Sequence, residues 1–467
     1  MNKYLTLILF SFLLNSCGTL RDSNELTKET NKKVFSVHTD KKTIIVMYNE
    51  QSFPWQVSNN KLNFPYNGET NKIAFLTPID TLRFPLPAGK SIPVDIILNK
   101  RDTIRAIAVG ISKPANFNNK YIAENKGKYI VYSPKVHELV NIAFALTNVG
   151  KNDHNMVNNE TEYYDKVITY FDKYKNHSLI DSLNQNMQND PYNYYYNLKM
   201  NACMYSFNEE NKIVNNSPYI RLGWGGDNYL EELLPLLENF ANESEFEKFY
   251  SQNYAYYQSL IDTYYKVLPI NKMWQWLEKR FSQRYDSYKI YFSPLVGGAH
   301  STEDFSDNGY KEIVMYVNAP IFPKEYTLIE NEMEASRVVF TEIDHNYINP
   351  ISDKLSDEIN NSFSFRFYWV LDDPGLNGYP TPYKVFNEYM TWSLYSLYCA
   401  DTFSKEDYDK CISKVENIMV QKRGFIKFKE FNQKLLEIYS NDKNIEMIDL
   451  IKSILEWSRQ KQNYVKN

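Results

Sequence analysis

The residues with the clearest capacity for chemistry are Thr341, Glu342 and His345. Residues three and four apart lie on one face of a helix, so Glu342 and His345 are neighbours there, and so are Thr341 and His345. This is the spacing of the H-E-x-x-H zinc motif, in which two histidines bind the metal and the glutamate activates its water. Thr341 stands where the motif has its first histidine, and a neutral hydroxyl is a poor zinc ligand.

A second segment, Asn387-Glu388-x-x-Thr391, lies a few tens of residues downstream. In the gluzincin metallopeptidases the third zinc ligand is a glutamate on a later helix, often preceded by asparagine, and this segment resembles that element. More widely, roughly residues 132–441 resemble an uncharacterised lipoprotein family, a domain of unknown function with a gluzincin-like core. Four stretches carry the wider resemblance: 136–142, 293–301, 341–350 and 386–392.

The resemblance implies metal-dependent hydrolysis of a peptide or protein substrate. By this analogy Glu342 is the general base, and His345 and Glu388 are zinc ligands. Thr341 and Asn387 are the accompanying motif positions. The replacement of the first histidine by Thr341 affects metal binding, and hydrolysis depends on that metal.

Two arrangements would still allow a divalent metal to bind. In one, His300 supplies the missing nitrogen from the cleft wall, so that His300, His345 and Glu388 bind zinc with one position open. Glu342 then stays free as the base. In the other, Glu342 is itself a ligand, because Glu342-x-x-His345 has the spacing of carboxylate-rich iron and manganese sites. Asp344 would then lie outside the ligand shell.

Two further functions fit the same sequence. Thr341 is also what we expect of an inactive, peptidase-like scaffold that binds peptide or protein without a metal. The abundance of aromatic residues, with 39 Tyr and 7 Trp, permits instead a surface lipoprotein that captures glycans or nutrients. That function requires four tryptophans to cluster on a surface: Trp224, Trp274, Trp276 and Trp392.

The start of the chain predicts export. A basic residue, Lys3, precedes an apolar stretch at 4–14, which is shorter than the roughly 20 residues that span a bilayer. Leu14-Asn15-Ser16-Cys17 resembles the lipobox of bacterial lipoproteins, which implies cleavage before Cys17 and acyl chains on that residue. We expect a signal peptide at 1–17, a flexible tether at 18–33, and a lipid anchor in the cell envelope, in the outer membrane rather than the inner one.

Composition limits the other possibilities. The net charge is −5 and no basic block occurs, which argues against nucleic acid as a partner. Besides Cys17 the chain has Cys203, Cys399 and Cys411, and no CxxC motif. Cys399 and Cys411 are close enough in sequence to form a disulfide, but their spacing does not establish one.

The periodicity of apolar residues predicts an α+β protein. Short strand-like runs separated by turns predict an antiparallel β-sandwich domain at 34–127; they include 43–48, 73–76, 93–98 and 103–109. A mainly α-helical, gluzincin-like domain with a small sheet is expected at 128–467, with the first helical face at 136–146.

Local patterns within the second domain give three further expectations. The strand-like runs 289–292 and 312–317, with the segment 297–301 between them, sit where gluzincins place the strands lining the substrate cleft. The helix that carries Glu342 is expected to be limited by Pro350. His137 and Glu138 begin an amphipathic pattern and are expected to be a capping or surface pair.

Overall fold

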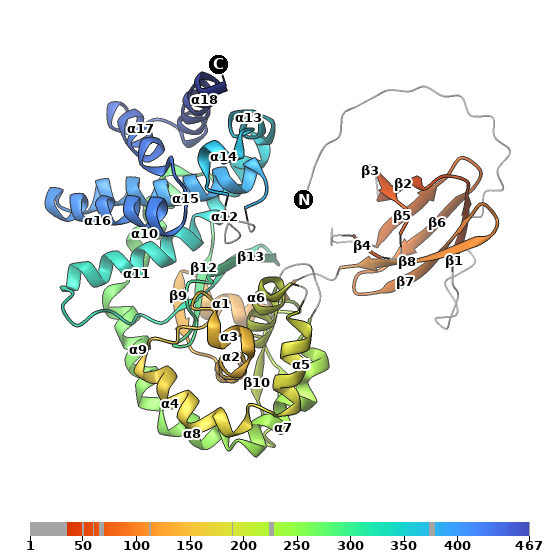
Figure 1. Cartoon of the computed structure of the whole chain (residues 1–467), viewed down its shortest axis with the longest axis horizontal. Coiled ribbons are helices and arrows are strands. Elements are labelled where there is room, and N and C mark those ends of the chain that lie inside the picture. The colour runs from red at the N-terminus through yellow and green to blue at the C-terminus, as the bar shows by residue number, and fades with distance from the viewer. Residues whose placement is uncertain are drawn as a thin grey trace. The chain divides into compact units, whose positions relative to one another are not determined.

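The computed structural model describes residues 35–466, apart from 49–50, 59, 65–69, 112–113, 189, 224–227 and 373–378. The predicted signal peptide and tether, including Cys17, lie outside the described residues. The chain divides into two compact units, Met1–Asn116 with Tyr219–Asp227, and Phe117–Pro218 with Asn228–Asn467 (Figure 1). Among the described residues, no helix has both the length and the apolar character needed to cross a membrane.

The first unit is built from two four-stranded sheets, with strand orders β1-β7-β8-β4 and β3-β2-β5-β6. The strands are β1 (Phe35–Thr39), β2 (Thr43–Tyr48), β3 (Gln51–Gln56), β4 (Lys61–Phe64), β5 (Asn71–Leu76), β6 (Thr81–Leu86), β7 (Ser91–Leu98) and β8 (Asp102–Gly110). Side chains from both sheets, such as Val37, Phe75 and Ile96, share one buried core. The predicted sandwich is confirmed, with parallel pairing only where β1 and β4 join their sheet.

The second unit contains a four-stranded sheet of order β13-β14-β12-β9. Its strands are β9 (Lys128–Tyr132), β12 (Ser287–Ser293), β13 (Ser301–Asp307) and β14 (Tyr310–Asn318). β12 is parallel to both neighbours and buried throughout, as expected of a strand covered on both faces. β13 is the antiparallel edge strand, and it turns into β14 through Asn308 and Gly309, both with positive φ.

Helices make up most of the second unit, which confirms the predicted α+β class (Figure 1). Before β12 they are α1 (Asn119–Asn125), α2 (Lys135–Leu146), α3 (Asn148–Asn152), α4 (Glu162–Phe171), α5 (Ser178–Asn186), α6 (Pro191–Ala202), α7 (Leu234–Glu243), α8 (Phe246–Gln252), α9 (Tyr254–Val267) and α10 (Ile270–Arg280), with a small hairpin of β10 (Tyr205–Phe207) and β11 (Ile213–Asn215). After β14 they are α11 (Leu328–Ile343), α12 (His345–Lys354), α13 (Ser356–Ser362), α14 (Arg366–Trp369), α15 (Pro382–Thr402), α16 (Lys405–Asn417), a π-helical turn (Ile418–Lys422), α17 (Phe428–Asn441) and α18 (Met447–Lys466).

α15 is the central helix of the C-terminal half. Every residue from Val385 to Cys399 is buried, so its polar side chains lie in the interior rather than in solvent. Cys399 Sγ lies 3.1 Å from Cys411 Sγ on α16, and both thiols are buried. Trp392 is buried in this core, and Trp274 and Trp276 are partly buried against it.

The segment that carries Glu342 differs from the single helix expected. α11 ends at Ile343, and α12 starts at His345 and continues past Pro350. The expectation that Pro350 limits the helix is wrong. Proline has no N–H to bond the carbonyl four residues back, which belongs to Asn346. The Tyr285 hydroxyl donates to that carbonyl at 3.1 Å, which compensates for the missing bond.

Candidate functional site

The end of α11, the start of α12, α15 and the residue after the π-helical turn bring four charged or titratable side chains together. They are Glu342, His345, Glu388 and Arg423, and we call them the central cluster. Glu388 interacts electrostatically with each of the other three. Residues that are 46 positions apart in sequence, Glu342 and Glu388, therefore meet, as the resemblance implied.

Glu388 is held by two donors. Arg423 Nη1 lies 2.5 Å from Glu388 Oε1, and Trp392 Nε1 donates to the same oxygen at 2.9 Å. Arg423 also donates to the Tyr379 hydroxyl at 2.6 Å and stacks 5.0 Å from the Trp392 ring. Burial acts to raise the pKa of Glu388, but the charge of Arg423 and the hydrogen bonds from Arg423 and Trp392 outweigh it, and the pKa falls below its ordinary value. Glu388 is therefore ionised and paired.

The Thr341 hydroxyl is bonded within its own helix. It donates back to the carbonyl of Arg337 at 2.9 Å and approaches that of Val338 at 3.2 Å. This is the usual way in which a helical threonine satisfies its own hydroxyl. At the position where the zinc motif has a histidine, the Thr341 hydroxyl therefore has its hydrogen-bond partner within its own helix.

Glu342 and Asp344 contrast with Glu388 because neither carboxyl has a partner. Within the described parts of the chain, the Glu342 carboxyl makes no hydrogen bond, and both Asp344 oxygens are buried without a well-formed one. Burial, and then the Glu388 charge, raise the pKa of Glu342 to about 8. Burial and the Glu342 charge raise the pKa of Asp344 well above its ordinary value. Glu342 is therefore protonated at neutral pH.

His345 and Asn387 are linked through Asn349, which the sequence patterns did not single out. The Asn387 amide donates to Asn349 Oδ1 at 3.1 Å, and the Asn349 side chain is hydrogen-bonded to His345. Burial lowers the pKa of His345, against the opposing effect of Glu388. His345 is therefore neutral. Asn387 acts on its orientation only indirectly, through the Asn349 side chain.

His300 is surrounded by cations. Its Nε2 lies 3.1 Å from the Gly297 carbonyl oxygen, and burial together with Lys199 and Arg337 lowers its pKa to about 3. Across the described residues, no three His, Cys, Asp or Glu side chains lie close enough together to hold one metal ion. Of the three ligands expected for a His₂Glu zinc centre, Glu388 is already paired with Arg423.

Lys199 supplies a second buried cation, from the last turn of α6. Its ammonium group donates to the Ala299 carbonyl and lies 4.7 Å from the centre of the Tyr196 ring. Burial lowers the pKa of Lys199 to about 7, although Glu342 opposes this shift. Lys199 and Arg423 carry no motif spacing, so nothing in the sequence marked them out.

A comparison with known families covers this whole region. A family described as a domain of unknown function, DUF4932, matches residues 129–449, which is well over half of the chain. The chain belongs to the DUF4932 family. No curated protein and no solved structure matches the chain significantly. The predicted membership of an uncharacterised family is confirmed, and every side chain of the central cluster lies within the DUF4932 domain.

The DUF4932 domain also contains a second buried histidine–glutamate pair, His137 and Glu138 on α2. Their exposed fractions are 1% and 0%, so the predicted capping or surface pair is wrong. α2 is buried from Val136 to Leu146, which leaves no solvent-facing side for either residue. Glu138 accepts from the Tyr163 hydroxyl at 2.7 Å, and burial raises its pKa to about 7.

Proposed function

We propose that the DUF4932 domain of this chain is a gluzincin-like scaffold that binds peptides without a metal. The observation that carries the proposal is the contact between Arg423 and Glu388, at 2.5 Å. Glu388 occupies the position of the third zinc ligand in the resemblance, and a guanidinium of the protein itself now supplies its positive charge. Arginine stays charged at all physiological pH values, so this pairing is permanent.

The charge balance of the cluster supports the same conclusion. A carboxylate removed from water needs a cation or several donors. Glu388 has both, from Arg423 and Trp392, and Glu342 is protonated instead. The cluster is therefore electrostatically complete without a metal.

The adjoining strand supports a peptide as the ligand. β13 is the outermost strand of its sheet and contacts the start of α12, where the Asn346 amide donates to the Thr302 hydroxyl at 3.0 Å. An extended peptide binds such an edge through main-chain hydrogen bonds, and neighbouring pockets select its side chains. The edge of β13 would place a peptide alongside the central cluster.

The proposal is tested on the full-length chain, purified in mild detergent without chelator. Metal content is measured by elemental analysis before and after incubation with zinc or manganese. A labelled pool of short peptides is then titrated for binding and examined by mass spectrometry for cleavage. We expect saturable binding, intact peptides and far less than one metal per chain. About one metal per chain, lost in His345→Ala, together with cleavage lost in Glu342→Gln, would replace binding by hydrolysis.

One observation favours a second candidate, a metal-dependent hydrolase. Glu342 and Asp344 lack well-formed side-chain hydrogen bonds among the described residues, beside the neutral His345, and an acid in this state is common where an ion binds. Carboxylate-rich sites prefer iron or manganese to zinc. Glu342 and His345 would hold such an ion, which supplies an activated water when bound. The measurement of metal content distinguishes this candidate from the first.

We further propose that the chain is a lipid-anchored protein of the cell envelope, acylated on Cys17. The basic start, the short apolar stretch and the position of Cys17 support this proposal. Metabolic labelling with a clickable fatty acid tests it. We expect label in the wild-type chain and none in Cys17→Ser, which should also leave the membrane fraction. Equal labelling of both would contradict the anchor.

A further inference from the structure

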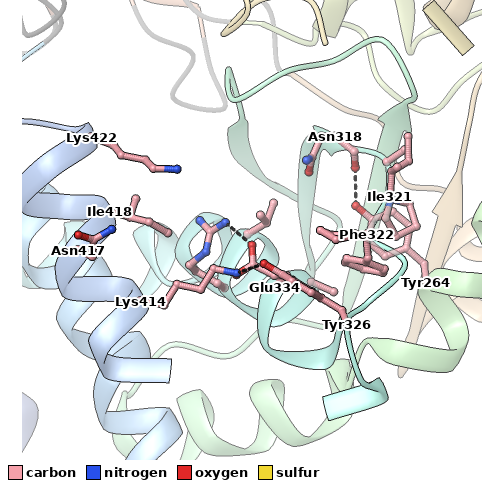
Figure 2. Close-up of a pocket in the computed structure, with 16 residues that line it drawn as sticks. Tyr264, Asn318, Ile321, Phe322, Tyr326, Glu334, Lys414, Asn417, Ile418 and Lys422 are labelled. Atoms are coloured by element: carbon pink, nitrogen blue, oxygen red, sulfur yellow. Dashed lines mark hydrogen bonds and ion pairs between the residues drawn. The ribbon is translucent and has the colours of Figure 1, made fainter. Parts of the chain in front are cut away.

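The described part of the second unit contains a cavity of about 470 Å³ that the central cluster does not use. It is formed by the loop after β14, by α11, by α16 and by the π-helical turn (Figure 2). Its volume is within the range of small-molecule and peptide-terminus pockets. One wall is apolar, with Pro320, Ile321 and Phe322, and the opposite wall is charged.

The charged wall has an excess of cations. Arg337, Lys414 and Lys422 line the cavity together with a single carboxylate, Glu334, so the local balance is +2. Glu334 is fully used, because Lys414 Nζ lies 2.7 Å from one of its oxygens and Arg337 Nη2 lies 3.1 Å from the other. Figure 2 shows Lys422 extending from the π-helical turn toward the middle of the pocket.

Two donors of this wall lack a partner. In the described portion of the chain, Lys422 forms no ion pair, and the Nε–H of Arg337 is buried without an acceptor. A buried donor without an acceptor calls for a ligand or ion to complete it. Guanidinium and ammonium groups together favour a carboxylate, which an arginine binds in its own plane.

The cavity adjoins the central cluster. The Arg337 guanidinium stacks 5.2 Å from the Trp392 ring, and Trp392 donates to Glu388. Arg337 also lies close enough to His300 to lower the pKa of that imidazole. Along α11, Arg337 and Glu342 are five residues apart, or about 7.5 Å. An extended peptide covers that distance with about two residues.

We propose that this cavity binds the C-terminal carboxylate of a peptide, with the last apolar side chain against Pro320, Ile321 and Phe322. The inference rests on the proposed peptide-binding function and names its ligand class. A peptide anchored at Arg337 and Lys422 extends along α11 over Glu342 and His345. Recognition of a free C-terminus then sets both the direction and the register of the bound chain.

The test compares peptides that differ only at the terminal group. N-terminally labelled pentapeptides ending in Phe are made as the free acid and as the amide, and their binding to the full-length chain is measured by fluorescence anisotropy. We expect the acid to bind at least tenfold more tightly than the amide. Lys422→Met should reduce binding of the acid several-fold and leave the amide unchanged. Lys452→Met removes an exposed lysine on α18 and is the matched control.

The possible outcomes distinguish the carboxylate pocket from the peptide-binding function on which it rests. Preference for the acid, lost in Lys422→Met but kept in Lys452→Met, supports the proposal. Equal binding of acid and amide overturns the carboxylate pocket while leaving the peptide-binding function intact. Failure of both peptides, and of the mixed peptide pool, overturns the proposed function and this inference with it.

Discussion

Two glutamates of the DUF4932 domain, Glu138 and Glu342, have similar acidities but opposite surroundings. Burial raises the pKa of Glu138 to about 7 and that of Glu342 to about 8. Glu138 accepts from Tyr163, whose hydroxyl is in turn 2.6 Å from that of Tyr257. Glu342 has no such network among the described residues, and a like charge, Glu388, adds to its shift.

The difference separates a structural acid from a functional candidate. A buried polar group in a connected network stabilises one arrangement of the core. A group of similar acidity that is only partly buried, beside like charge and without hydrogen bonds is what a binding or catalytic cleft contains. A raised pKa alone does not identify a site; the missing partners do.

The largest expected contrast comes from truncating both acids. Glu138→Ala removes the acceptor of Tyr163 from a fully buried position and leaves a cavity, so we expect a loss of about 3 kcal/mol in the free energy of unfolding. Glu342→Ala removes a carboxyl that makes no hydrogen bond, so its cost should stay below about 1 kcal/mol. Urea unfolding measures both. Equal losses would remove the distinction between the two sites.

The ion pair of the central cluster gives the next effect. Arg423→Met leaves Glu388 buried without its cation, which should cost about 2–3 kcal/mol. Arg423→Met combined with Glu388→Gln should recover most of that loss, because no charge remains to be paired. Lys410→Met breaks an exposed pair with Glu406 and should leave the free energy of unfolding nearly unchanged. Stability that does not recover in the double variant would contradict the role given to the pair.

The pH dependence of stability should sharpen the comparison further. Both acids have a folded-state pKa above the ordinary 4.5, so their contribution is complete below pH 4.5 and is lost as pH rises. The loss of stability should level off near the folded-state pKa, which is about 7 for Glu138 and about 8 for Glu342. Relative to wild type, Glu138→Gln and Glu342→Gln should therefore gain stability over these windows, on the order of 2 kcal/mol. Melting curves from pH 4 to 9 would show whether the two end points differ.

The smallest effect concerns the metal. Thr341→His alone restores the motif, but Glu388 stays paired with Arg423, so we expect little gain in zinc affinity. Thr341→His with Arg423→Gln frees Glu388 and should bind zinc at least tenfold more tightly than the single variant, or about 1.4 kcal/mol. Isothermal titration calorimetry measures both. Full zinc binding by Thr341→His alone would show that Arg423 does not block the site.

Much of the fold follows from local sequence patterns. The strands with regular alternation, such as Thr43–Tyr48, and the helix at Lys135–Leu146 lie where the apolar period places them. β13 was not anticipated, because Ser301–Asp307 is mostly polar and its pairing with β14 is a tertiary property. The buried state of His137 and Glu138 was also missed, since polar residues on a helix that is covered on every side give no periodic signal.

The central cluster was predicted only in part. The spacing of Glu342 and His345, with the later Asn387-Glu388, identified side chains that do meet. Arg423 and Lys199 come from segments with no motif, and only the three-dimensional arrangement brings them to the two glutamates. The sequence therefore indicated the two glutamates of the cluster but not Arg423 and Lys199, whose positive charges lie beside them.

The π-helical turn at Ile418–Lys422 sets the direction in which Arg423 points. Such a turn holds one residue more than an α-helical turn, and the Arg423 amide accordingly bonds the carbonyl of Ile418, five residues back. Loss of one codon here would restore the α-helical period and rotate the following residue by about 100°. Arg423 would then swing away from Glu388. We expect a one-residue deletion in this turn to leave Glu388 without its arginine and open to a cation from solution.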